Sequence, residues 1–323
     1  MKRIAVLTSG GDSPGMNAAI RAVVRSAVFH DIDVLGVFKG YQGLVEGDFK
    51  KLHVRSVAKI LGRGGTILKS ARCEEFMTEG GRAKAIENLR NNNVDGLVVI
   101  GGNGTFTGAL KLFNEYGFPV IGLPGTIDND LDGTDNTIGF DTATNNVIEA
   151  VDKIRDTADS HNRLFFVEVM GRDNGFIALR TGIATGAIAV MTPETEISVD
   201  GLVQVLAEGQ KNKKSSSIVI VAEGNSSGGA YKLAQEVKKR TDQYDIRITV
   251  LGHLQRGGSP SCSDRVLASR LGIEAVEALK NGVTNSMVGV VNDNLIHTPF
   301  EDAIANKTHT LKDEVRIARI LSI

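Results

Sequence analysis

Cysteine and tryptophan are nearly absent from this sequence, which has two cysteines and no tryptophan among its 323 residues. Cys73 and Cys262 cannot form a disulfide framework, which argues against a small secreted scaffold. Long apolar runs are also missing, and none approaches the ~20 residues that span a bilayer. The apolar start at residues 4–7 reaches Gly10 and Gly11 too soon for a signal peptide. We therefore expect a cytoplasmic protein with no membrane partner.

A strong excess of charge of one sign is lacking as well. Lys and Arg number 37 against 38 Asp and Glu, which gives a formal net charge of -1. Such a chain has no global field that attracts nucleic acid, so we expect no nucleic-acid partner. Any anion binding must come from local groups of basic residues and backbone amides. The length favours about two domains of ~150 residues each.

Short apolar runs alternate with helical patterns along the chain. Expected strands cover residues 4–7, 34–38, 96–100, 119–123, 164–169, 218–222, 246–251 and 287–291; expected helices include 105–116, 142–158, 199–211, 230–241 and 263–279. The strand runs show little alternation, which is typical of parallel sheets covered on both faces. The pattern predicts an α/β protein, with two doubly wound lobes of mainly parallel sheets.

Two carboxylates follow one of these strands, in Gly125-Thr126-Ile127-Asp128-Asn129-Asp130. Open α/β sheets hold ligands beyond the carboxyl ends of their strands. If this segment is extended, Asp128 and Asp130 project to the same side and Asn129 is turned away. One carboxylate could then accept a proton while the other helps to hold a metal. Asp-Asn-Asp is also ordinary loop chemistry, with an Asx turn as the alternative.

Two glycine loops have the composition of phosphate cradles: Gly10-Gly11-Asp12-Ser13-Pro14-Gly15 and Gly101-Gly102-Asn103-Gly104-Thr105. Each follows an apolar strand and precedes a helical pattern, so backbone N–H groups at a helix start could face an anion. Tight strand-to-helix turns would use the same glycines. Neither loop is a Walker A loop, and the dinucleotide spacing is incomplete, so a Rossmann dehydrogenase is disfavoured.

Arginines recur where apolar runs end, and a guanidinium presents a rigid fork that suits phosphate. A single such arginine is usually a solvated surface residue, but several of them beside glycine loops and paired carboxylates favour phosphoryl transfer. They are Arg72, Arg163, Arg172, Arg247 and Arg256.

With these motifs in order, the chain resembles the bacterial ATP-dependent 6-phosphofructokinases from Ile4 to at least Ile304. The resemblance rests on both glycine loops, the first continuing into Met16-Asn17, and on Pro124 to Asp130, Met170-Gly171-Arg172 and Gly252-His253-Leu254-Gln255-Arg256-Gly257-Gly258. It implies phosphorylation of fructose 6-phosphate at its 1-hydroxyl, with ATP as co-substrate, Mg²⁺ as cofactor and an active site between the lobes. The implied nucleotide-binding lobe covers residues 1–139 plus about 255–305, and the sugar-phosphate lobe covers 140–254 plus about 306–323.

The resemblance also implies a role for each matching residue. Asp128 matches the general base, Asp130 an acid near the metal, Thr126 a contact to the transferred group and Arg172 a residue that stabilises its charge. Matching nucleotide-site positions are Gly11, Tyr41 (beside adenine), Arg72, Cys73, Gly102, Asn103, Gly104 and Thr105. Matching sugar-phosphate positions are Thr126, Ile127, Asp128, Met170, Gly171, Arg172, Glu223, His253 and Arg256, with Arg163 and Arg247 reaching in from a neighbouring subunit of a homotetramer.

Asn103 departs from the family pattern, which has an aspartate at this position near the nucleotide's magnesium. An amide supplies no charge, so the resemblance implies a slowed kinase or one that needs more magnesium. A catalytically weak subunit that senses sugar phosphate is the alternative. The branch that uses pyrophosphate typically has an aspartate and a lysine where Gly104 and Gly125 stand, so ATP is favoured as the donor.

An effector site for ADP or phosphoenolpyruvate is implied at a subunit interface. Matching positions are Arg21, Arg25, Arg55, Arg155 and Lys214, and Arg21 and Arg25 share a helix face at i, i+4. Ile188 stands where many relatives have an acid that helps to hold the effector's metal. We therefore expect altered allosteric control.

Overall fold

The computed structural model describes residues 1–159, 163–195, 197–211, 217–305 and 311–321. The chain divides into two compact units. Unit 1 is Met1–Thr142 with Arg256–Lys307, and unit 2 is Ala143–Gln255 with Thr308–Ile323. Lys214 lies outside the described residues.

Unit 1 is built on a seven-stranded sheet with the order β11-β10-β5-β4-β1-β2-β3. The central strands are parallel: β10 (Ser286–Val291), β5 (Val120–Pro124), β4 (Gly96–Gly101), β1 (Arg3–Thr8) and β2 (Asp33–Val37). The edge strands β3 (Phe49–Leu52) and β11 (Asn294–Pro299) pair antiparallel with their neighbours. The predicted α/β class with mainly parallel sheets is confirmed.

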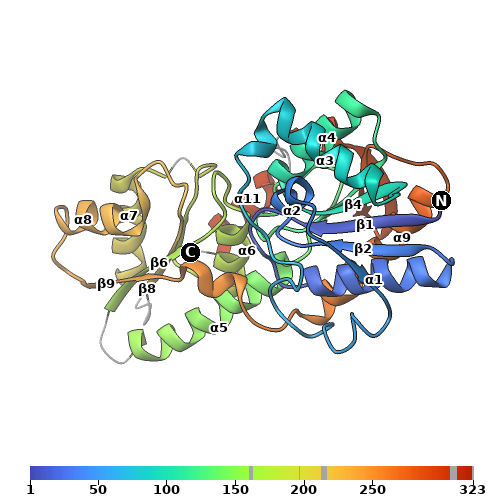
Figure 1. Ribbon diagram of the computed structural model, residues 1–323. Helices are drawn as coiled ribbons and strands as arrows, with labels where there is room; N and C mark the ends of the chain where they lie inside the picture. The colour runs from blue at the N-terminus through green and yellow to red at the C-terminus, as the bar shows by residue number, and fades with distance from the viewer. Residues whose placement is uncertain (160–162, 196, 212–216, 306–310, 322–323) are drawn as a thin grey trace. The chain divides into compact units, whose positions relative to one another are not determined.

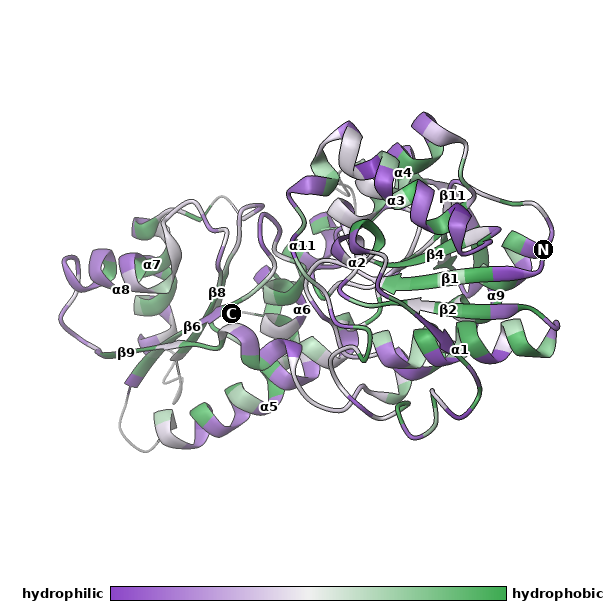
Figure 2. Ribbon diagram, in the orientation of Figure 1, coloured by the Kyte–Doolittle hydropathy of each residue, from purple (hydrophilic) through white to green (hydrophobic). Residues whose placement is uncertain are grey.

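Helices cover both faces of this sheet, as Figure 1 shows. Successive residues of β1 point to opposite faces. Ile4 and Val6 therefore join the cluster that includes α1 (Met16–Phe29) and α9 (Cys262–Lys280), whereas Ala5 and Leu7 join the cluster on the other face. That second cluster includes residues of α2 (Tyr41–Glu46), α3 (Glu79–Asn91), α4 (Asn103–Tyr116) and α10 (Phe300–Ala303). Burial on both faces explains why the strand sequences are continuously apolar, as their green colour in Figure 2 shows.

Unit 2 has a four-stranded parallel sheet with the order β7-β8-β6-β9. Its strands are β6 (Arg163–Val169), β7 (Ala189–Met191), β8 (Ser217–Ala222) and β9 (Asp245–Val250). The helices are α6 (Phe176–Thr185), α7 (Val199–Lys211), α8 (Gly229–Lys238) and α11 (Leu311–Leu321), and α5 (Phe140–Asp159) runs from unit 1 into unit 2. Leu164 and Phe166 of β6 pack in one cluster with Leu202, Leu206 and Leu233 of α7 and α8.

No helix among the described residues is both long enough and apolar enough to cross a bilayer.

Candidate active site

Three neighbouring strands of unit 1 end at one edge of the sheet, and each leads into one of the predicted loops. Because β1, β4 and β5 are parallel and adjacent, their carboxyl ends lie side by side. Ser9 donates its backbone N–H to Ile100 O at 3.0 Å, and Gly125 donates to Gly101 O at 2.9 Å. The sheet therefore brings together the two glycine loops and the segment with the paired aspartates.

The first glycine loop depends on close backbone approach. Gly15 has φ 107° directly before α1, a conformation that favours glycine. The guanidinium of Arg256 lies against Gly11, where an added Cβ would come within 2.6 Å of Nη1, and the same nitrogen donates to Asp12 O at 2.9 Å. The side chain of Arg256 therefore packs against the first glycine loop of unit 1.

The second glycine loop runs into α4, which begins after Gly102, and no side chain in the described part of the chain caps this helix. Its first backbone N–H groups are therefore available for an anion. A Cβ added at Gly104 would meet no atom within 4 Å, so open space lies beside the first turn. Thr105 is buried, and its hydroxyl makes no hydrogen bond with any described residue. The start of α4 is thus suited to phosphate.

The segment after β5 is not extended, so the expectation that alternation alone places Asp128 and Asp130 on one side was wrong. The chain bends at Ile127 and Asp128, and Asn129 has φ 53°, in the left-handed region. Asn129 tolerates this conformation and fastens it: its Nδ2 donates to Asp135 O at 3.2 Å and its Oδ1 accepts from Thr137 N at 2.8 Å. We call residues 126–130 the catalytic turn, after the role that the sequence predicts for Asp128.

Further hydrogen bonds hold the catalytic turn from both ends. Asp128 donates its backbone N–H to Thr126 Oγ1 at 3.2 Å, and Thr137 Oγ1 donates to Thr126 O at 2.6 Å. Ile138 donates to Pro124 O at 2.8 Å. Asp128 is only 1% exposed, so its carboxylate is largely desolvated, and these bonds hold the backbone on which it is carried. Such a carboxylate can act as a positioned proton acceptor.

Asn103 faces the second aspartate of the turn. Its Nδ2 donates to Asp130 Oδ2 at 2.7 Å, while its Oδ1 is buried and accepts no hydrogen bond from any described residue. The described residues contain no group of three or more His, Cys, Asp or Glu side chains that could hold a metal alone. One carboxylate and one amide oxygen fit Mg²⁺, which prefers oxygen ligands and is commonly completed by substrate phosphates.

Other predicted nucleotide-site residues lie near the first glycine loop or in the core. Ser70, just before Arg72 and Cys73, donates its hydroxyl to Gly10 O at 2.8 Å, and Arg72 itself is exposed. Tyr41 is only 6% exposed and its ring stacks on Phe76 with centroids 4.1 Å apart. Its hydroxyl donates to Thr105 O at 2.5 Å. Burial raises the pKa of Tyr41, so its hydroxyl stays protonated and holds the first turn of α4.

The predicted sugar-phosphate residues of unit 2 gather where β6 and β8 end. Glu223 donates its N–H to Val169 O at 2.9 Å and accepts from Arg172 N at 2.8 Å through Oε1. Arg172 has φ 52° and follows Gly171, whose φ is 140°. Met170 donates its N–H to Oε1 of the buried Gln255, in the 3₁₀ helix η2 (Gly252–Arg256) that also contains the exposed His253.

Arg163 and Arg247 lie together, but far from Met170. Both pair with Asp245, at 3.1 Å from Arg163 Nε and 2.8 Å from Arg247 Nη1. Arg163 begins β6, whereas Met170 follows its last residue. Seven residues of strand separate them by roughly 20 Å. Within one chain, the two arginines cannot join the cluster around Arg172 and Glu223.

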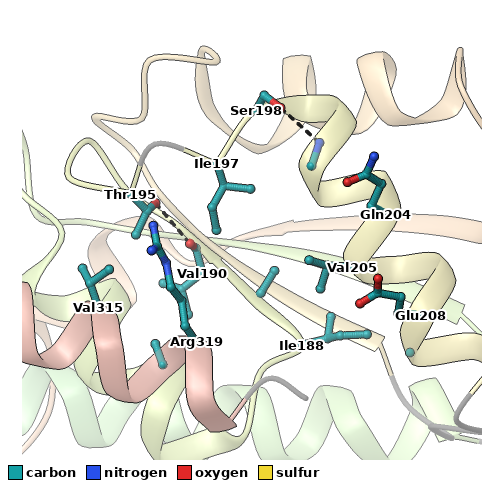
Figure 3. Close-up of a pocket in the computed structure, with 14 residues that line it drawn as sticks. Ile188, Val190, Thr195, Ile197, Ser198, Gln204, Val205, Glu208, Val315 and Arg319 are labelled. Atoms are coloured by element: carbon teal, nitrogen blue, oxygen red, sulfur yellow. Dashed lines mark hydrogen bonds between the residues drawn. The ribbon is translucent and has the colours of Figure 1, made fainter.

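The predicted effector residues are divided between the units. Arg21 and Arg25 of α1 line one small pocket of unit 1, and Arg55 lies in a turn of the same unit. Arg155 of α5 donates to Thr185 O in unit 2. Ile188 is 3% exposed in the core of unit 2 and lines a pocket of about 510 Å³ with Val190, Val205 and Val315 (Figure 3). The side chain at the position where the resemblance implies an acid is thus apolar and buried.

Three polar residues hold the catalytic turn and the segments beside it, and the sequence motifs indicate no role for them. They are Asn129, Gln255 and Asp264. Asn129 and Gln255 stand inside quoted motifs, so their positions were visible but their hydrogen bonds were not. Asp264 had only a weak local signal, because Ser261 and Asp264 have the spacing of a helix-capping pair. Ser261 Oγ does accept from Asp264 N, at 3.1 Å.

Parallel sheets with glycine loops at helix starts and a buried aspartate at the carboxyl edge define a phosphate-handling α/β protein. A family model described as "PFK: Phosphofructokinase" matches residues 3–279. The chain belongs to the phosphofructokinase family.

Among similar curated proteins is ATP-dependent 6-phosphofructokinase 2 of Bacteroides thetaiotaomicron, which is 53% identical over 323 residues, covering 100% of this chain and 99% of that protein. ATP-dependent 6-phosphofructokinase 1 of Thermus thermophilus is also 53% identical, covering 100% of both chains.

Among solved structures, the phosphofructokinase of Pichia pastoris has a TM-score of 0.89 at 37% identity, covering 98% of this chain and 36% of that chain. This chain thus spans about a third of the Pichia chain. A pyrophosphate-dependent phosphofructokinase from Marinobacter aquaeolei has a TM-score of 0.84 at 22% identity, covers 99% of this chain and 91% of that chain, and supports the fold alone.

Proposed function

We propose that this protein is an ATP-dependent 6-phosphofructokinase that transfers the γ-phosphoryl group of ATP to the 1-hydroxyl of fructose 6-phosphate. The products are fructose 1,6-bisphosphate and ADP, as in glycolysis, and we expect the enzyme in the cytoplasm. The observation that carries the proposal is the 53% identity over the full length of curated relatives with this name. The catalytic turn at the carboxyl edge of the unit 1 sheet supports it.

Asp128 is the proposed general base. It would accept the proton of the sugar 1-hydroxyl as that oxygen bonds to the γ-phosphorus and the bond from the γ-phosphorus to the bridging oxygen of ADP breaks. The hydrogen bonds of the catalytic turn would hold the backbone of Asp128, and burial would limit the space open to its carboxylate, before substrate arrives. Phosphoryl transfer needs mainly positioning and charge neutralisation, which this geometry favours. Thr126 and Arg172 would contact the transferred group.

The start of α4 and the first glycine loop are the proposed nucleotide phosphate site. Backbone N–H groups at Gly102, Asn103 and Gly104 would face the phosphates, with Gly11, Arg72 and Cys73 completing the site. Open space beside Gly104 leaves room for the additional phosphate of a nucleotide, which supports ATP over pyrophosphate.

Asn103 and Asp130 are the proposed residues that hold Mg²⁺, directly or through water. A cation held by these two residues would supply positive charge that offsets the negative charge developing during transfer. Asn103 Oδ1 is a buried oxygen with no partner among the described residues, so it can serve as a neutral ligand. Its amide nitrogen already donates to Asp130, which fixes that carboxylate without a second negative charge.

Met170, Gly171, Arg172, Glu223, His253 and Arg256 are the proposed sugar-phosphate residues. Arg163 and Arg247 would reach the same site from a second copy of the chain, because strand separates them from Met170 in their own copy, by roughly 20 Å for Arg163 and roughly 15 Å for Arg247, which pairs with Phe165. The proposed assembly is a homotetramer. Arg21, Arg25, Arg55, Arg155 and Lys214 are the proposed effector residues, for ADP or phosphoenolpyruvate.

Formation of fructose 1,6-bisphosphate from fructose 6-phosphate, with ATP or pyrophosphate as donor and across a magnesium titration, tests the function. Turnover with ATP and little with pyrophosphate is the expected result. Calorimetry with fructose 6-phosphate provides the control, since binding without turnover from either donor would contradict the kinase and indicate a sugar-phosphate-sensing protein.

A further inference from the structure

The buried carboxylate of Asp264 in α9 packs against the start of α5, next to residues 137–139, which hold the catalytic turn. Asp264, in the first turn of α9, is only 1% exposed. Its Oδ1 accepts from Gly139 N at 2.8 Å, and its Oδ2 accepts from Thr142 N at 2.8 Å and from Thr142 Oγ1 at 2.5 Å. Three donors converge on two oxygens, an arrangement that suits an ionised carboxylate and leaves no place for an amide NH₂.

Gly139, which donates to Asp264, is joined to the turn that carries the proposed general base by the backbone of residues 137–138 and their hydrogen bonds. Gly139 follows Thr137 and Ile138, and Ile138 bridges to Gly125 at the entry to the catalytic turn. Thr137 Oγ1 donates to Thr126 O at 2.6 Å, and Thr137 N donates to Asn129 Oδ1 at 2.8 Å. Asp128 lies between these two anchored residues. A shift at Gly139 therefore reaches Asp128 through two short hydrogen bonds.

The same segment also supports the first glycine loop. Gly139 has φ 106°, and an added Cβ would come within 2.6 Å of Ser13 Cβ. A Cβ added at Gly15 would come equally close, 2.6 Å, to Ile138 Cγ2. The backbone of residues 138–139 is thus held between Asp264 on one side and the glycine loop on the other.

The start of α9 is joined to the start of α5 by a second set of hydrogen bonds. Ser261 N donates to Thr142 Oγ1 at 2.9 Å, and Ser261 Oγ donates to Asp141 Oδ2 at 2.5 Å. Asp141 and Asp264 both lie in the first turn of a helix, where the helix dipole favours negative charge. Asp141 is thus joined to α9 through Ser261, whereas Asp264 accepts directly from Gly139, and Asp141 serves as the control.

We propose that Asp264 is a positioning residue for the phosphoryl-transfer step, which holds residues 137–139 so that the catalytic turn presents Asp128 in a productive place. This inference rests on the proposed kinase function. Asp264 touches neither substrate in this role and acts only through Gly139, Thr142 and Thr137.

Asp264→Asn tests the proposal, because the amide keeps the shape but sets an NH₂ group against a backbone or hydroxyl donor. We expect kcat to fall by about 10-fold to 100-fold, since small misplacements of a catalytic group have effects of this size. KM for fructose 6-phosphate should stay within about threefold, because Arg172 and Glu223, which are proposed to bind it, lie in unit 2. Asp141→Asn should leave kcat within about twofold of wild type while lowering the melting temperature.

Hydrogen–deuterium exchange supplies a readout without turnover. In Asp264→Asn, residues 124–139 should exchange faster than in wild type, whereas residues 199–211 of α7 in unit 2 should not change. In Asp141→Asn, residues 124–139 should exchange as in wild type. Faster exchange in both regions of Asp264→Asn, or equal loss of kcat in both variants, would indicate general destabilisation and overturn the proposal.

If Asp264→Asn does not fold, Thr142→Val and Thr142→Ser decide the question. Valine removes only the hydroxyl bonds, so kcat should fall by about threefold to tenfold, and serine should restore it. Wild-type kcat in Thr142→Val would overturn the proposal. A wild-type protein without turnover would instead contradict the kinase function, and the exchange experiment would still test whether Asp264 holds residues 124–139.

Discussion

The candidate functional residues of the two units differ in how they are held. In unit 1, Asp128 is buried and its turn is fastened by side chains and backbone together. In unit 2, Arg172 and Glu223 are exposed and are joined through a backbone N–H. Arg163 and Arg247 share one carboxylate, Asp245, at half-exposed positions.

This difference suits two different tasks. A group that must accept a proton in one geometry gains from being fixed before the substrate arrives. Exposed charges that bind a sugar phosphate need only be within reach, because water competes with them until the ligand arrives. Substitution of Asp128 in unit 1 should therefore change kcat, and substitution of Glu223 in unit 2 should change KM.

The largest expected effect is the loss of the general base. Asp128→Ala should lower kcat by about 10²-fold to 10⁴-fold, which is the usual contribution of a positioned base. KM for fructose 6-phosphate should change little, because the charges proposed to bind the sugar phosphate remain. Steady-state kinetics with ATP, together with calorimetry of fructose 6-phosphate binding, provide the check. Turnover equal to wild type would contradict the role of Asp128.

The substitution Asn103→Asp should have the next largest effect. It removes the amide donor to Asp130 and places two carboxylates within hydrogen-bond distance, which a divalent cation can neutralise. We expect the half-saturating magnesium concentration to fall by about 10-fold to 100-fold, the usual effect of a residue that supports a metal. Magnesium titrations of activity and of nucleotide binding measure it. An unchanged magnesium requirement would remove Asn103 from the proposed metal site.

Glu223→Gln tests unit 2. It weakens the bond to Arg172 N and removes a charge near the proposed sugar site, so KM for fructose 6-phosphate should rise by about tenfold. Because the catalytic turn is untouched, kcat should stay within about threefold. Glu236→Gln, on the exposed surface of α8, is the matched control and should leave both constants unchanged. A fall in kcat without a rise in KM would break the comparison.

The smallest effect concerns a carboxylate that holds the start of β1. Burial raises the pKa of Asp95, but the backbone N–H donors of Lys2 and Arg3 outweigh it, so the pKa lies below its ordinary value of 3.8. The ionised Asp95 carboxylate therefore stabilises the folded protein fully above pH 3.8, its ordinary pKa. This stabilisation is lost as the pH falls through the lower pKa that Asp95 has in the folded protein.

Asp95→Asn should therefore lower the melting temperature at pH 7 by about 1–2 °C. The difference from wild type should shrink as the pH falls below about 4. Melting curves of both proteins between pH 7 and pH 3 measure it, and a difference that grows on acidification would contradict the assignment.

The sequence predicted the elements that carry continuous apolar runs and the glycine loops that follow them, because burial on both faces imposes a pattern on neighbouring residues. It did not predict β3 and β7, which have only four and three residues, or β11, a six-residue edge strand whose residues are exposed or partly exposed and form no continuous apolar run. The shape of the catalytic turn was also missed, because the left-handed Asn129 depends on partners at 135 and 137.

Long-range partners account for the remaining misses. Asp264 meets Gly139 and Thr142 across 125 and 122 residues of chain, a separation at which no local spacing is informative. The stacking of the Tyr41 ring on Phe76 also follows from packing in unit 1, which no local spacing indicates.

The place of Arg163 and Arg247 at the far end of β6 has one more consequence. If a second copy supplies these guanidiniums, part of the affinity for fructose 6-phosphate belongs to the assembly and none of it to a single chain. Dilution that dissociates the assembly would then lower the affinity for fructose 6-phosphate. A ligand that stabilises the assembly would raise this affinity without contacting the sugar.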